Sequence, residues 1–135
     1  MQIDRVELAD CTSPERIIAE ILRQIPDLPI PVPIEELATA VGITAIHRMT
    51  TDNFEGGLIT QPERRDGVIL VNGKANRLRQ RYTIGHELGH YLIRRRHPRF
   101  LLLQHSDDLL FAEPVPLHLV RLLVRAELYL SLEEI

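Results

Sequence analysis

The chain lacks most of the residues that would mark a secreted, membrane-spanning or nucleic-acid-binding protein. Cys11 is the single cysteine among 135 residues, which excludes an intrachain disulfide and a cysteine-based zinc site. Tryptophan is absent and tyrosine and phenylalanine number three each, so aliphatic side chains must dominate the core. The formal net charge of −3 gives no general attraction to nucleic acid.

Long apolar runs are also missing. No run approaches the length of a membrane span, and residues 1–10 lack the basic and apolar regions of a signal peptide. We therefore expect a cytoplasmic protein with no membrane segment and no direct contact with nucleic acid. The length suits one domain, which we predict to cover residues 1–135. Nothing in the sequence indicates an oligomeric state.

The pattern of apolar residues and chain breakers predicts an α+β fold. Ser13 and Pro14 are typical of a helix start, and the helix that they begin ends before Pro26. A second helix is predicted over residues 33–41, closed by Gly42. Three short strands are predicted at residues 43–49, 58–60 and 68–71. Because they are close in sequence, we expect a small antiparallel three-stranded sheet.

The rest of the chain predicts helices only. A long helix is expected over residues 75–94, after the turn that follows the third strand. Proline and basic residues then interrupt the pattern. Two more helices are predicted, over residues 107–112 and 117–132, the second with an amphipathic leucine pattern.

The long helix contains the most informative stretch, His86-Glu87-Leu88-Gly89-His90. It spells H-E-x-x-H, in which two histidines four residues apart lie on one side of a helix, one turn from each other. Both imidazoles can therefore bind one metal ion. The glutamate between them can take a proton from a metal-bound water without binding the metal itself. The alternative is a surface helix with two solvated histidines and a glutamate.

Two segments resemble the ImmA/IrrE family of zinc metallopeptidases (Peptidase M78). Residues 79–92 read R-x-R-Y-T-I-G-H-E-L-G-H-Y-L, which is similar to the active-site helix of that family. Residues 33–43 fit its P-I/V-x-x-L-A-x-x-x-G-I segment. The resemblance covers about residues 14–93. It implies a zincin-like fold, with the sheet packed on the H-E-x-x-H helix and flanked by further helices.

The same resemblance implies roles for individual residues. His86 and His90 match the zinc-binding histidines of the family, and Glu87 matches its general base. Members often cleave or inactivate a helix-turn-helix transcriptional repressor. The resemblance therefore implies a Zn²⁺-dependent cytoplasmic peptidase whose partner is such a repressor.

The third zinc ligand is harder to predict, because the family string E-x-E-A-N-x-F-A-x-x-L-L-x-P is absent here. Aligning residues 111–112 with its Phe-Ala pair would place Asp107 at the ligand position. A ligand on a following helix needs enough residues for the chain to return to the two histidines. This requirement favours Glu113, which lies 23 positions after His90. We predict Glu113 and keep open Asp107, Asp108, Glu127 or no third protein ligand. His97 and His105 are less favoured candidates.

Three functions remain open at this point. The favoured one is a zinc metalloendopeptidase that hydrolyses a peptide bond in a protein, with Glu87 as the catalytic residue. The second is an inactive or weakly active protein of the same fold, which regulates a DNA-binding partner by contact. The third, a DNA-binding regulator, is disfavoured by the net negative charge and the lack of a recognisable recognition helix.

Overall fold

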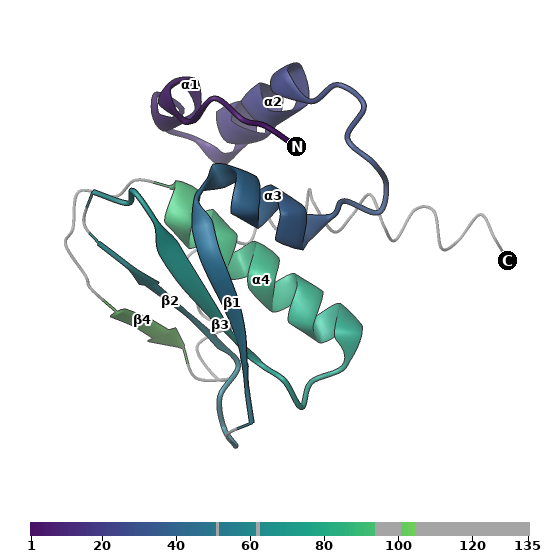
Figure 1. Cartoon of the computed structure of the whole chain (residues 1–135), viewed down its shortest axis with the longest axis vertical. Coiled ribbons are helices and arrows are strands. Elements are labelled where there is room, and N and C mark those ends of the chain that lie inside the picture. Colours follow the sequence, from purple (N-terminus) through teal and green to yellow (C-terminus); the bar gives the residue numbers. More distant parts are fainter. Residues whose placement is uncertain (51, 62, 94–100, 105–135) are drawn as a thin grey trace, which may run out of the picture.

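The described residues form an α+β arrangement of helices and one sheet (Figure 1). The computed structural model describes residues 1–50, 52–61, 63–93 and 101–104. The helices are α1 (Arg5–Ala9), α2 (Pro14–Gln24), α3 (Ile34–Val41) and α4 (Arg77–Leu92). The strands are β1 (Ile43–Met49), β2 (Gly56–Thr60), β3 (Gly67–Asn72) and β4 (Leu101–Gln104). The helices predicted over residues 107–112 and 117–132 lie outside the described residues.

The sheet is mixed, so the prediction of a purely antiparallel sheet is wrong. Its order is β1-β3-β2-β4, with β1 parallel to β3 and β2 antiparallel to both β3 and β4. β3 lies between β1 and β2, although these two strands follow each other in the chain. Ile69 and Val71 of β3 are fully buried, and a strand that is this apolar is most stable where strands flank it on both sides.

β4 extends the sheet beyond three strands and was not predicted. It follows α4 in the chain and pairs with β2, so that Leu58 lies opposite Leu102. The sequence shows only a short apolar run here. Its partner strand lies more than 40 positions earlier, so that no local pattern indicates the pairing.

The helix ends follow the local chemistry of the sequence. The Ser13 hydroxyl accepts a hydrogen bond from the amide of Arg16 at the start of α2, as its N-cap position predicts. α3 ends at Gly42, whose φ of 113° is in the left-handed region that glycine adopts without strain. At α4, the Asn76 side chain caps the amide of Arg79. The predictions for these three helices are confirmed within a few residues at each end.

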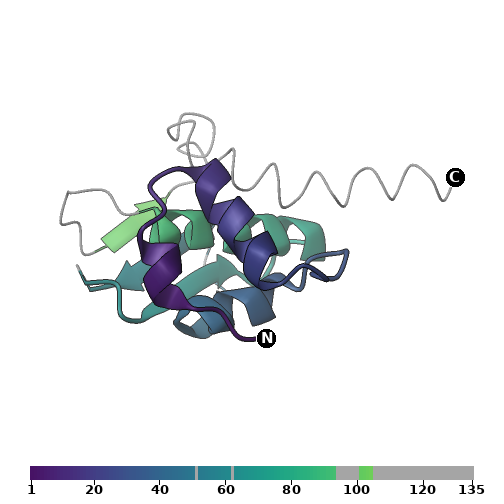
Figure 2. The ribbon, with the colours of Figure 1, turned by 90° about the horizontal axis from the view of Figure 1, so that it is seen from above.

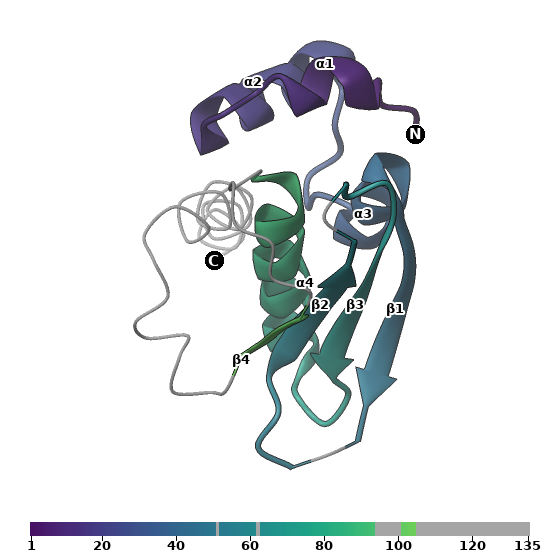
Figure 3. The same ribbon diagram turned by 90° about the vertical axis from the view of Figure 1, so that its left-hand side faces the viewer.

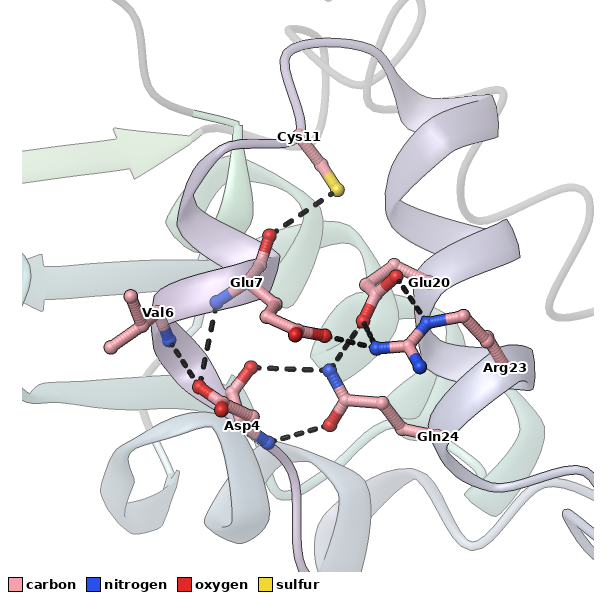
Figure 4. A network of polar contacts seen from close by, with 7 residues as sticks. All are labelled: Asp4, Val6, Glu7, Cys11, Glu20, Arg23 and Gln24. Atoms are coloured by element: carbon pink, nitrogen blue, oxygen red, sulfur yellow. Dashed lines mark hydrogen bonds and ion pairs between the residues drawn. The ribbon is translucent and has the colours of Figure 1, made fainter.

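α1 was not predicted, and polar contacts hold it against α2 (Figure 4). Asp4 caps α1 through its side chain, and its backbone amide donates to Gln24. The Arg23 guanidinium contacts both Glu7 of α1 and Glu20 of α2, and its hydrogen bonds lower the pKa of Glu20 to about 2. Arg23 and Glu7 are exposed and Glu20 is half-buried, so each ion pair adds little to stability. They fix the position of a helix too short to persist alone.

α4 lies along one face of the sheet, and α1 and α2 lie together at one end of the molecule (Figures 2 and 3). A shared aliphatic core joins these parts, as the scarcity of aromatic residues predicts. Its most buried members are Ile17, Ile21, Leu37, Ala38, Val41, Ile43, Leu58, Ile69, Val71, Ile84 and Leu88. In the part of the chain that the structure describes, no helix combines the length and the apolar character needed to cross a membrane.

Candidate metal centre

α4 brings the two histidine side chains of the H-E-x-x-H motif together. The Nε2 atoms of His86 and His90 lie 3.1 Å apart, and the two rings meet edge to face with an interplanar angle of 83°. Two nitrogens that bind one tetrahedral zinc ion at 2.0–2.1 Å are about 3.3 Å apart. The side-chain orientations therefore fit a single ion held by both Nε2 atoms.

Burial separates this arrangement from an ordinary surface helix. His86 and Glu87 are each only 1% exposed, whereas His90 is partly exposed. The alternative of solvated side chains on a surface helix is therefore wrong. His86 and Glu87 lie inside the protein, and His90 marks the side of the site nearest to solvent.

Glu87 is an acidic residue in a strongly desolvated position. Burial raises the pKa of its carboxyl to about 8. Its Oε2 atom is buried and has no hydrogen-bond partner among the described residues. A buried polar atom without a partner is costly in a folded protein, which indicates a group kept for a proton, a water molecule or a cation.

Gly56 of β2 lets the sheet approach this carboxylate closely. A Cβ atom at position 56 would lie 2.3 Å from the Cγ2 atom of Thr83 and 3.3 Å from Oε1 of Glu87. β2 therefore lies directly against the turn of α4 that holds the buried glutamate. Sequence reasoning did not identify this contact. The one available signal was a glycine at the start of a short strand, which often marks a close approach of another group.

Substitution of Gly56 by alanine is expected to destabilise the protein by about 1–3 kcal/mol, the usual cost of overpacking. The added methyl group must displace Thr83, because it cannot remain 2.3 Å from Cγ2. Urea denaturation measures the loss. The double variant Gly56→Ala/Thr83→Ser lacks the clashing methyl group and should recover most of the stability. An alanine variant as stable as the wild type would contradict the contact.

The third predicted ligand cannot be placed beside the two histidines. Glu113 and the alternatives Asp107, Asp108 and Glu127 lie outside the described residues, as do His97 and His105. Within residues 1–50, 52–61, 63–93 and 101–104, no three His, Cys, Asp or Glu side chains gather into a metal-binding group. The donors that are present, two imidazole Nε2 atoms beside a buried carboxylate, still fit a zinc ion by their chemistry and spacing.

Two imidazoles and a buried glutamate on one helix, packed against a sheet, are typical of the metallopeptidase class. Comparison with known families agrees. The sequence model of the Peptidase M78 family, described as the IrrE N-terminal-like domain, matches residues 38–114, more than half of the chain. The chain therefore belongs to this metallopeptidase family. No curated protein matches the chain.

Proposed function

We propose that the chain is a zinc-dependent endopeptidase with a zincin-like fold, which hydrolyses a peptide bond in a protein substrate. The observation that supports it best is the 3.1 Å separation of the His86 and His90 Nε2 atoms beside the buried Glu87. These two histidines would hold Zn²⁺ together with a third ligand, for which we propose Glu113. When bound, the ion supplies Lewis acidity that polarises a carbonyl group and acidifies a water molecule.

Glu87 would act as the general base and then as the general acid. A bound cation favours the ionised carboxylate, which is the form of Glu87 that can take a proton. In the first step Glu87 takes a proton from the attacking water. In the second step it gives this proton to the nitrogen of the leaving amine as the C–N bond breaks. The burial of the side chain keeps bulk water from competing for that proton.

The substrate that we propose is a helix-turn-helix transcriptional repressor, and this proposal rests on the family resemblance. An extended segment of such a protein could pair with an open edge of the sheet through backbone hydrogen bonds. A repressor substrate would place the reaction in the cytoplasm. A product-like peptide found bound away from the sheet edges would contradict this mode of binding.

Zinc content tests the proposed metal site. We expect one zinc per chain for the purified wild type by inductively coupled plasma mass spectrometry, and almost none for His90→Ala. The matched control is His47→Ala, which removes an exposed histidine of β1 and should keep its zinc. A wild type without metal after preparation with excess zinc, or His90→Ala with full zinc, would contradict the proposal.

A second candidate is a protein of the same fold that regulates a DNA-binding partner by contact alone. The observation that favours it is the absence of the family string E-x-E-A-N-x-F-A-x-x-L-L-x-P from the sequence. A site with two histidines and no third protein ligand would bind zinc weakly. Stable binding of the repressor by a metal-free chain, without cleavage, would support this candidate over the peptidase.

A further inference from the structure

The turn between β2 and β3 reaches the C-terminal end of α4, the helix that carries the histidine pair. Its Arg64 side chain donates through Nη1 to the carbonyl oxygens of His90, at 2.8 Å, and Tyr91, at 2.9 Å. The same nitrogen donates to the carbonyl oxygen of Ile93. One guanidinium therefore holds three carbonyl groups at the end of this helix.

Two of these carbonyl groups, those of His90 and Tyr91, are among the ones that the helix cannot satisfy by itself. The last four carbonyls of an α-helix have no intrahelical partner, and the helix dipole makes this end favourable for a cation. α4 ends at Leu92, so His90 lies in its last turn. The direction of the His90 ring depends on the backbone of that turn, which frays easily when its carbonyls are not held.

The turn is itself held from two sides. The Tyr91 hydroxyl donates to the carbonyl oxygen of Arg64 at 2.9 Å, so Arg64 and Tyr91 each bind the backbone of the other. Arg5 of α1 donates to the carbonyl oxygens of Arg64 and Arg65, and also to the Tyr91 hydroxyl. These contacts join α1, the turn and the end of α4, which lie at the same end of the molecule (Figure 3).

The backbone conformation of Arg64 indicates that its contacts hold it in place. Its φ of 49° lies in the left-handed region, which is unfavourable for a residue with a Cβ atom. A surrounding structure must hold such a residue in place. Here the hydrogen bonds of its carbonyl group and of its guanidinium do so.

We propose that Arg64 is a positioning residue for the metal site: by holding the last turn of α4, it keeps the Nε2 atom of His90 beside that of His86. This inference rests on the proposed function, because it concerns the ligands of the proposed zinc ion. Arg64 acts through the backbone of His90 and would not touch the ion or the substrate.

Metal affinity tests this role without any substrate. The folded full-length chain is titrated with Zn²⁺ in competition with a chromophoric chelator, and with Co²⁺ while its visible absorption is recorded. We expect Arg64→Ala to bind Zn²⁺ on the order of ten-fold more weakly, as is typical when the support of a ligand is removed. We also expect a changed Co²⁺ spectrum, because the geometry of the donors changes. The matched control is Arg65→Ala, an exposed arginine next in sequence, which should behave as the wild type.

The possible outcomes distinguish the positioning role of Arg64 from the proposed function. A folded Arg64→Ala protein with wild-type Zn²⁺ affinity and Co²⁺ spectrum would overturn the positioning role and leave the proposed function intact. A wild type that binds neither ion would overturn the proposed function and this inference with it. If circular dichroism shows that Arg64→Ala does not fold, Arg64→Lys decides. A lysine ammonium does not reproduce the planar donor geometry of a guanidinium, so we expect weaker binding, and wild-type affinity would overturn the role.

Discussion

Replacement of Glu87 by glutamine is expected to slow peptide-bond hydrolysis by about 10²–10⁴-fold, the usual contribution of a general base. Glutamine has nearly the same shape as glutamate, but its amide cannot take a proton from water. The measurement is intact mass spectrometry of a candidate substrate, a helix-turn-helix repressor of the proposed class. It is incubated over time with the wild type or with the variant.

The controls separate proton transfer from loss of the site. Glu36→Gln makes the same change at an exposed position of α3 and should cleave as the wild type does. The zinc content of Glu87→Gln should remain at the wild-type level, because Glu87 is not proposed as a ligand. Equal cleavage by the wild type and Glu87→Gln would remove this residue from the mechanism.

The metal-free wild type is expected to lose stability as the pH rises from about 4.5 to 8. The pKa of Glu87 is about 8 in the folded chain, against an ordinary value of 4.5 when unfolded. Between these values the folded chain keeps a proton that the unfolded chain has released. The free energy of unfolding therefore falls with rising pH, and this one group contributes a loss of about 3 kcal/mol by pH 7.

Urea denaturation in the presence of a chelator, at several pH values, measures this effect. Glu87→Gln removes the titrating group. The free energy of unfolding of the variant minus that of the wild type should therefore increase with pH. Subtracting the two proteins cancels the titration of the groups that do not interact with Glu87. The pH trend should shrink when zinc is present, because a nearby cation favours the ionised carboxylate. A difference that does not change between pH 5 and pH 7 would contradict the raised pKa.

The sequence predicted those parts of the fold that local chemistry determines. Ser13 and Pro14 set the start of α2, and Gly42 sets the end of α3 through its left-handed backbone. The strand predicted over residues 43–49 is β1 with the same bounds. Each of these signals involves residues within one turn or strand of each other, so the sequence alone carries the information.

The arrangement of the strands could not be read in the same way. Alternating apolar residues show that a segment forms a strand, but they do not show which strand pairs with it. The insertion of β3 between β1 and β2 depends on how much apolar surface β3 buries, which involves the whole sheet and α4. α1 was missed because its five residues are held by contacts with α2 and have no strong periodic pattern of their own.

For the same reason, only part of the candidate site could be predicted from the sequence. His86, Glu87 and His90 lie within one turn and a half of α4, and their spacing predicted that the two imidazoles would meet. Gly56 and Arg64 come from β2 and from the turn after it, and only the tertiary fold brings them to the helix. In the sequence, an arginine in a charged turn looks like any other surface residue. The position of Glu113 lies outside the described residues and stays a prediction.

β4 follows α4 in the chain, and this order has a consequence for folding and for shorter versions of the protein. β2 is covered on one side by β3, but its other side stays an open edge until β4 has been synthesised, after α4. Ile59 on this strand is 44% exposed even in the folded protein. An open, apolar strand edge is a template for pairing with another chain. A version that stops at residue 93 would keep the whole H-E-x-x-H helix and still expose that edge, so we expect it to self-associate.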